Sequence, residues 1–166
     1  MTKTEEYILK LTNLKTGELG LLRTHSGQQL DESVEGFDLF SGLWWPLRQE
    51  SQHAPRREVA WLIAKLYAFS PMTHSHEALL AHKLASFQPK EERAKKRFRQ
   101  KFDDMLLTPL SKIEPMLQWA LTEIASASNK LDWVKLTDDL SAWERERTRW
   151  EWALQFLGTE EREEQC

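Results

Sequence analysis

The sequence predicts an all-α fold, a compact bundle of about eight helices. Apolar residues recur at three- and four-residue spacing along most of the chain, which is the pattern of helices with one buried face. No stretch alternates apolar and polar residues between turn residues, so strands are not expected. With 40% apolar residues, including eight tryptophans, the chain can fill a core.

The domain organisation is expected to be simple. A chain of 166 residues is long enough for one domain that buries roughly 70% of its extended-chain surface. No internal repeat or low-complexity linker divides it, so we place one domain over residues 1–166. Within it the helices allow two packed subdomains, 1–107 and 108–158, followed by an acidic tail at 159–166.

Four helices are expected before residue 70. Pro46 and the polar run after it end the third helix, and Pro55 suits the first turn of the fourth. The fourth is the most apolar and is expected to be the central core helix. The four spans are 5–14, 18–24, 37–47 and 55–69.

The remaining helices begin with a short piece at 77–87 and a strongly basic helix. Ser111, with Glu114 three residues later, fits a capping box that opens the next helix, and Asp132 can cap the one after it. The last amphipathic segments, which run to Gly158, carry Trp143, Trp150, Phe156 and Leu157.

The basic helix has the most unusual charge pattern of the chain. The segment from Lys90 to Lys101 holds seven cations and two carboxylates, a net charge of +5, whereas the whole chain carries −3. Residues 102–166 carry −7. An acidic chain that concentrates positive charge in one element indicates an anionic ligand.

The helical phase of this segment separates an apolar stripe from the cations. Like charges then face each other on the other side, at a cost of a few tenths of a kcal/mol per pair. A solvated bundle face is the alternative, but an arrangement that costs stability favours a bound anion. The stripe is Ala94, Phe98, Phe102 and Met105, with Leu106 at its edge, and the opposing cations are Arg93, Lys96, Arg97 and Arg99.

Two further arginines occupy an unfavourable position. Arg56 and Arg57 begin the fourth helix, where the positive end of the helix dipole disfavours cations. They are either ordinary surface arginines or part of the same anion-binding surface. Arg23, in contrast, lies at a helix C-terminus, where a cation is favourable.

No catalytic, metal or cofactor site is predicted. His74, His76 and His82 cluster, but no pair of them has the four-residue spacing of a zinc-protease helix, so we expect surface histidines. Asp138 and Asp139 point about 100° apart on a helix, as for capping and solvation rather than acid–base chemistry. A hydrolase is expected only if an unexpected pocket appears.

The tryptophans are expected mainly in the core. Trp133, Trp143 and Trp150 share the apolar phase of the last helices. Trp45 and Trp152 lie out of phase with their tryptophan neighbours and are the candidates for exposure, where they could stack on bases.

The chain is expected to be cytoplasmic. Its single cysteine, Cys166, allows no internal disulfide, as suits a reducing compartment. Its start lacks the pattern of a signal peptide, and no 18-residue apolar window is free of charges, so no membrane contact is expected.

Three sets of residues carry a resemblance to a known family. The early set is Gly17, Leu19, Leu22 and Arg23, and the basic helix adds Arg93, Arg97 and Phe98. The closing set is Leu131, Asp132, Trp133, Leu136, Asp138, Asp139, Leu140, Trp143, Arg149, Trp150 and Phe156. Together they resemble the CasB-like small subunit of the type I-E CRISPR Cascade surveillance complex. Gly20 and Thr24 depart from that pattern, which has alanine and often a second arginine there.

The resemblance implies two packed helical subdomains without enzymatic activity. It also implies two copies, head to tail, beside the guide RNA, the backbone repeat subunit and the large subunit of the complex. These copies would hold the displaced single-stranded DNA.

We therefore expect a non-enzymatic nucleic-acid-binding subunit that stabilises an R-loop through phosphate contacts. The alternative is an α-helical adaptor whose basic helix binds an acidic protein. The residues expected to contact nucleic acid are Arg23, Arg56, Arg57, Arg93, Lys96, Arg97, Arg99, Lys101 and Lys112.

Overall fold

The computed structural model describes the backbone of residues 1–28 and 34–165 and the side chains of residues 1–28 and 37–158. Helices dominate this part of the chain, which confirms the all-α prediction. The elements, of which η2 is a short 3-10 helix, are α1 (Lys3–Thr12), α2 (Thr16–Thr24), α3 (Val34–Glu50), α4 (Arg57–Phe69), β1 (Thr73–His74), α5 (Leu80–Ser86), α6 (Glu92–Leu107), η2 (Leu110–Lys112), α7 (Glu114–Ala125), β2 (Lys130–Leu131), α8 (Trp133–Ser141) and α9 (Glu146–Gln165).

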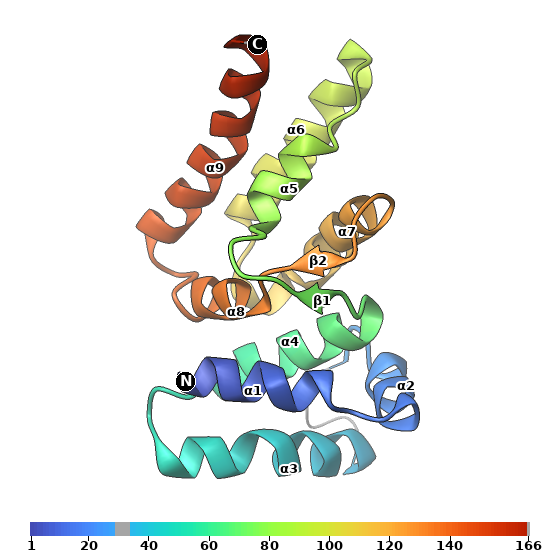
Figure 1. Ribbon diagram of the computed structural model, residues 1–166, viewed down its shortest axis with the longest axis vertical. Helices are drawn as coiled ribbons and strands as arrows, with labels where there is room; N and C mark the ends of the chain where they lie inside the picture. Colours follow the sequence, from blue (N-terminus) through green and yellow to red (C-terminus); the bar gives the residue numbers. More distant parts are fainter. Residues whose placement is uncertain (29–33, 166) are drawn as a thin grey trace.

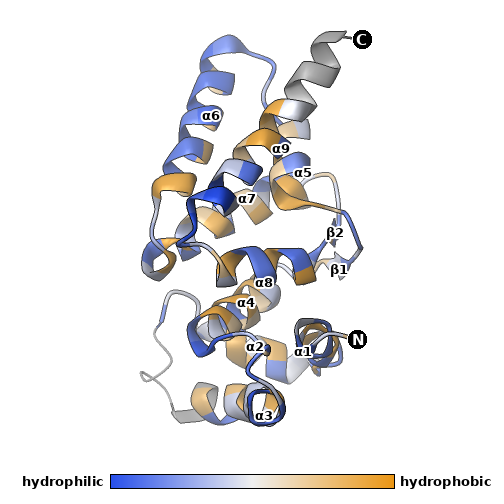
Figure 2. Ribbon diagram, turned by 90° about the vertical axis from the view of Figure 1, so that its left-hand side faces the viewer, coloured by the Kyte–Doolittle hydropathy of each residue, from blue (hydrophilic) through white to orange (hydrophobic). Residues whose placement is uncertain are grey.

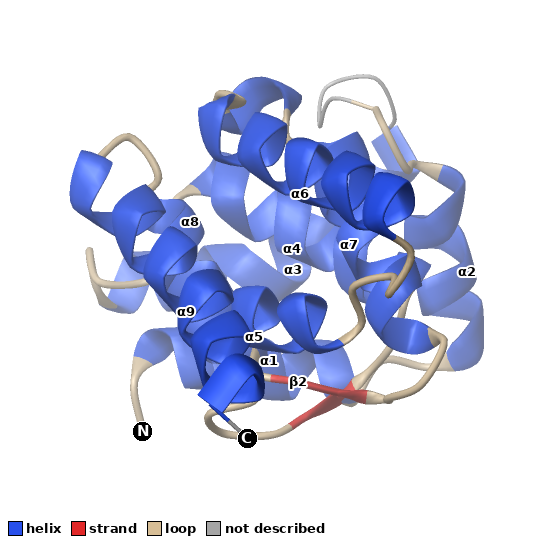
Figure 3. Cartoon of the chain, turned by 90° about the horizontal axis from the view of Figure 1, so that it is seen from above, coloured by secondary structure: helices blue, strands red, loops and turns tan. Residues whose placement is uncertain are grey.

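The helices gather in two groups, one at each end of the molecule (Figure 1). Helices α1 to α4 lie at one end. Helices α5, α6 and α9 run together at the other, and in the view from above α4 and α3 are seen behind and between them (Figure 3). Helices α5 and α6 pack on α7 and α9. The predicted subdomain boundary at residue 107 stays a prediction, and it would divide this second group.

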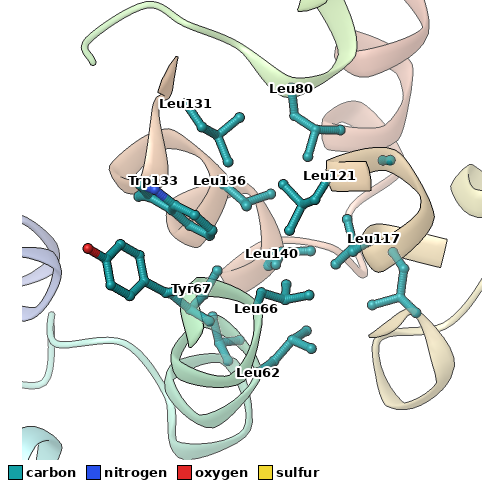
Figure 4. Packing of buried hydrophobic residues seen from close by; sticks show 14 of the residues in the cluster. Leu62, Leu66, Tyr67, Leu80, Leu117, Leu121, Leu131, Trp133, Leu136 and Leu140 are labelled. Atoms are coloured by element: carbon teal, nitrogen blue, oxygen red, sulfur yellow. The ribbon is translucent and has the colours of Figure 1, made fainter. Parts of the chain in front are cut away.

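Helix α4 lies at the centre of the core, as predicted. All residues from Val59 to Ala68 are buried. Near its end, the rings of Tyr67 and Trp133 meet edge to face with centroids 5.4 Å apart. Leucines of both helix groups belong to one apolar cluster, whose burial holds the groups together. Figure 4 shows this cluster around Leu62, Leu66, Leu117, Leu121, Leu136 and Leu140.

A parallel pair of two-residue strands, β1 and β2, was not predicted. Thr73 aligns with Lys130, and His74 aligns with Leu131. Backbone atoms make this short bridge, so the pattern of side chains carries no sign of it.

Asp132 joins the strand pair to two helices. One of its carboxylate oxygens accepts from the backbone N–H of Lys135 and caps α8, as predicted. The other accepts from the backbone N–H of Glu77. Glu77 has a left-handed φ of 69°, and helix α5 therefore begins at Leu80 rather than at residue 77.

Further predicted helix ends are wrong. Helix α3 contains Pro46 and ends at Glu50, three residues beyond the predicted end at residue 47. Helix α7 begins at Glu114 rather than at Ser111, because the carboxylate of Glu114 turns to the ammonium of Lys65 instead of back to a cap.

The tryptophans show where the predicted phase fails. Trp133 and Trp143 are fully buried and Trp45 is 50% exposed, as expected. Trp150 and Trp152 are reversed: Trp150 is 64% exposed, whereas Trp152 is buried and packs on Trp143. The turn between α8 and α9 resets the helical phase, so a period counted through it assigns the wrong side of α9 to the core.

The buried Trp152 also changes the role predicted for Asp139. The indole Nε1 of Trp152 donates to the carboxylate of Asp139 at 2.8 Å, and the ammonium of Lys135 donates to the other oxygen at 2.7 Å. Asp139 is buried. It therefore links α8 to α9, which corrects the prediction of a solvated carboxylate.

Candidate nucleic-acid interface

Helix α6 is fixed with one face against the core. The carboxylate of Glu91 caps its N-terminus by accepting from two backbone N–H groups of the first turn. Phe98, Phe102 and Met105 of the predicted apolar stripe are buried, whereas Ala94 and Leu106 are half-buried. Phe102 stacks on Phe156 of α9 with ring centroids 4.2 Å apart, and Phe98 meets Trp119 of α7 at 5.1 Å. These contacts fix the rotation of the helix, so its opposite face is directed to solvent.

That opposite face carries the predicted cations. Arg93, Lys96, Arg97, Arg99 and Lys101 are all exposed, and α6 is hydrophilic along most of its length (Figure 2). Within the described residues, the side chains of Arg93, Lys96 and Arg97 form no hydrogen bond or ion pair. The structure thus brings five of the nine predicted residues onto one surface, which we call the α6 face.

Lys101 lies at the edge of the α6 face. Its Nζ is 5.4 Å from the ring centroid of Trp119, which is a cation–π contact. The charge remains accessible to solvent while its position is held at the junction of α6 and α7.

A second group of cations lines a cleft of about 550 Å³, which we call the α4 cleft. It lies where the first half of α4 faces η2, the beginning of α3 and the turn before α9. Two predicted residues, Arg56 and Arg57, are among its lining residues. These are Phe37, Arg56, Arg57, Glu58, Trp61, Leu62, Lys65, Pro109, Leu110, Ser111, Glu114, Glu144 and Arg149.

Most charges in the α4 cleft are paired. The ammonium of Lys65 lies 2.7 Å from Oε1 of Glu114, with both side chains largely buried. At the rim, the guanidinium of Arg56 lies 3.3 Å from Oε1 of Glu144. A hydrogen bond from its own backbone N–H, and then the one from Arg56, hold the pKa of Glu144 below its ordinary value. Little net charge is therefore left in the cleft.

The buried pair of Lys65 and Glu114 also holds the turn at residues 25–28. Oε2 of Glu114 accepts from the backbone N–H of Gly27. The backbone carbonyl of Gln28 accepts from Lys65 Nζ at 2.8 Å and from the indole Nε1 of Trp61 at 3.0 Å. This ion pair therefore stabilises the fold, a role that no sequence pattern around Lys65 indicated.

Two residues of the cleft were missed as candidates, Phe37 and Arg149. The Nε of Arg149 donates to the carbonyl of Trp143 at 2.9 Å, and its guanidinium lies 5.6 Å from the centroid of the Trp143 ring. Phe37 belongs to no motif, and Arg149 was noted only as part of the family resemblance, because the cleft is assembled from segments far apart in the chain.

The other two predicted residues lie outside the α6 face. Lys112 is exposed in η2, next to the α4 cleft. Arg23 donates through Nε to the carbonyl of Ala68 at 3.0 Å. Because Ala68 lies near the C-terminal end of α4 and Arg57 begins it, a helix length of about 17 Å separates Arg23 from the cleft arginines.

A hydrolase was expected only if an unexpected pocket appeared, and the α4 cleft is such a pocket. Its side chains therefore bear on whether the chain could hydrolyse a substrate. Ser111 is the one hydroxyl side chain among its described lining residues, and no hydrogen bond links it to a base. Among the residues that the structure describes, no group of three or more histidine, cysteine or carboxylate side chains is placed to hold a metal ion.

No described helix is both long enough and apolar enough to cross a membrane.

Comparison with known proteins gives one family. The model of the CRISPR-associated protein Cse2 family matches residues 18–157. No curated protein matches the chain in sequence.

Several solved structures share the fold. M. ruber CasB is similar with a TM-score of 0.77 and 23% identity, over 99% of this chain and 97% of that one. A Cse2-family CRISPR-associated protein from Thermus thermophilus has a TM-score of 0.70 and 20% identity, over 95% and 99%. A chain of E. coli Cascade bound to a PAM-containing dsDNA target has a TM-score of 0.69 and 18% identity, over 96% and 99%.

Proposed function

The chain belongs to the CRISPR-associated protein Cse2 family, and on that premise we propose that it is a non-enzymatic, nucleic-acid-binding subunit of a cytoplasmic CRISPR RNA-guided Cascade complex. It stabilises the R-loop by holding the displaced DNA strand and the backbone of the guide RNA. The observation that carries this proposal is the α6 face, where Arg93, Lys96 and Arg97 are exposed and have no partner among the described residues.

Phosphate contacts suit this task. They are blind to sequence, as binding to a displaced strand of any target must be. An R-loop exchanges one duplex for another of similar stability, so a few neutralised phosphates can tip the balance. Lys112 and Arg57 are exposed and remain predicted contacts, whereas Arg56 would have to exchange its pairing with Glu144 for a phosphate. Arg23 remains a predicted contact at the other end of α4.

The proposal includes the backbone repeat subunit, the large subunit and a second copy of this chain as partners. It is supported by the E. coli Cascade structure, in which a chain of the same fold occurs together with a dsDNA target. Charge supports the second copy, because residues 90–101 carry +5 and residues 102–166 carry −7. A basic surface that meets an acidic surface of the next copy gives a head-to-tail contact that does not close on itself.

The isolated chain is expected to be monomeric at physiological salt, because exposed charge pairs are weak and screened. Two or more adjacent copies are expected in the assembled complex. Sedimentation of the free chain and native mass spectrometry of the complex measure both states. A tight dimer of the free chain that resists salt would contradict the proposed contact.

The test of phosphate binding is a salt titration against single-stranded DNA of several unrelated sequences. Changing Arg93, Lys96 and Arg97 together to alanine should weaken binding about equally on every sequence. The slope of log affinity against log salt should flatten by about 0.7 for each lost contact.

The matched control changes three exposed cations elsewhere, Lys15, Lys130 and Arg147, to alanine. It removes the same net charge, and the slope of log affinity against log salt should stay close to that of the wild type. If the slope of the α6 variant equals that of the wild type, phosphate binding by the α6 face is wrong. Loss of binding to an acidic protein subunit, with DNA binding intact, would favour the adaptor instead.

A further inference from the structure

The α4 cleft is not used by the phosphate contacts of the α6 face. Resting on the proposed function, we propose that this cleft receives one unstacked base of the bound single strand. Its volume of about 550 Å³ lies within the roughly 300–1,000 Å³ of pockets that enclose small ligands. A double helix cannot enter such a space, whereas a single base can.

The lining of the cleft combines apolar and charged side chains, which suits a base because a base has an apolar face and a polar edge. Phe37 is 43% exposed and is one of the lining residues of the cleft, as are the apolar Pro109 and Leu110. Every base has a π-face that can stack on an aromatic ring, so such a contact tolerates any sequence. This tolerance matches the requirement on a subunit that holds displaced strands of many targets.

The charges of the cleft favour a base over a second phosphate site. Lys65 is neutralised by Glu114 and Arg56 is paired with Glu144, which leaves few free cations inside. Arg57 is exposed at the rim, where it can meet the phosphate next to an inserted base. Arg149 is held by the Trp143 ring and carbonyl, and a guanidinium fixed in this way offers a plane on which a base can stack.

The chain also connects the α6 face to the cleft. Helix α6 is about 24 Å long, and its C-terminal end leads directly into Pro109 and Leu110 of the cleft wall. The C-terminal end of α6 therefore lies next to the wall of the cleft.

The test compares two oligonucleotides of about 16 nucleotides, one intact and one with abasic sites throughout. Both carry the same phosphates, so only contacts to bases distinguish them. The full-length chain should bind the intact strand about tenfold more tightly, as expected for one stacked base. Phe37→Ala should lower this ratio to about twofold or less. The control Phe69→Ala removes an exposed aromatic of the same type at the far end of α4, outside the cleft, and should leave the ratio unchanged.

The outcomes separate this inference from the proposed function. If the variant lacking Arg93, Lys96 and Arg97 weakens both strands equally while Phe37→Ala reduces only the preference for bases, both proposals hold. If Phe37→Ala leaves the preference intact, or if the wild type shows none, the base site is wrong and the phosphate contacts stand. If neither strand binds in a salt-dependent way, the proposed function itself fails. Weaker capture of a protein subunit by Phe37→Ala, without a change on DNA, would assign the cleft to a protein side chain.

Discussion

Helices α4 and α6 both carry cations, and they use them in opposite ways. On α4, Lys65 is buried against Glu114 at 2.7 Å and holds the turn that ends at Gln28. On α6, Lys96 and Arg97 are exposed and have no partner among the described residues. The same residue types thus hold the fold in one helix and face solvent, ready for a ligand, in the other. The face on which a side chain lies, more than its chemical type, decides its role.

The largest expected effect extends this comparison to two tryptophans near the C-terminus. Trp143 is fully buried and its indole donates to the carbonyl of Thr108, whereas Trp150 is 64% exposed. Trp143→Ala should lower the free energy of unfolding by about 3–5 kcal/mol. Trp150→Ala should change it by no more than about 0.5 kcal/mol. Urea unfolding followed by circular dichroism measures both changes in free energy. Similar losses of stability in the two variants would show that the difference in burial between Trp143 and Trp150 does not determine their contribution to stability.

The second-largest effect is expected when the same substitution, lysine to methionine, is made on α4 and on α6. Lys65→Met leaves the carboxylate of Glu114 buried without its cation and should cost about 3 kcal/mol of unfolding free energy. Lys96→Met, at an exposed position of α6, should stay within about 0.5 kcal/mol. Urea unfolding at neutral pH gives both values.

A double variant shows whether the loss comes from the unpaired charge. Lys65→Met with Glu114→Gln removes the charge but keeps an acceptor for the N–H of Gly27. It should recover more than half of the loss. No recovery would mean that lost packing around α4, and not the buried carboxylate, explains the effect of Lys65→Met.

Much of the fold could be predicted because its signals are local. The apolar run from Val59 to Ala68 fixed the place of α4 in the core, and the stripe through Phe98 and Phe102 fixed the rotation of α6. Asp132 caps α8 as its position in the chain predicts. Given the rotation of α6, the outward direction of its cations followed from the helical period alone.

The errors arise where a distant contact overrides a local signal. Glu114 could have served a capping box with Ser111, but Lys65 and Gly27 take its carboxylate. The turn before α9 changes the phase on which the placement of Trp150 depended. The α4 cleft could not be predicted, because its lining comes from four separate parts of the chain and no local pattern shows that these parts meet.

A smaller effect tests the contact of α4 with the N-terminal helix through pH. The hydroxyl of Tyr7 donates to the carbonyl of Ala60 at 2.6 Å, and burial raises the pKa of Tyr7 well above its ordinary value. The unfolded state therefore ionises first, so the stability that Tyr7 provides is present below about pH 10 and is lost as the pH rises above it.

Tyr7→Phe removes both the hydrogen bond and the ionisation. It should lower the free energy of unfolding by about 1 kcal/mol at pH 8. At about pH 10.5 the wild type should have lost about 0.8 kcal/mol that the variant cannot lose, so the two proteins should nearly converge. Urea unfolding at both pH values decides this, and a gap that is equal at both would show that Tyr7 does not ionise on unfolding.

The smallest expected effect concerns Arg97, and it gives the comparison its sharpest form. Arg97 has a like charge four residues away in each direction, Arg93 and Lys101. Each such pair costs a few tenths of a kcal/mol, so Arg97→Gln should raise the free energy of unfolding by a few tenths while it weakens binding to single-stranded DNA. The gain should disappear in about 1 M salt, where charges are screened beyond about 3 Å. On α4, by contrast, removal of Lys65 lowers stability. If Arg97→Gln proves destabilising at low salt, the α6 face contributes to the fold after all, and its exposed cations are no longer evidence for an anionic ligand.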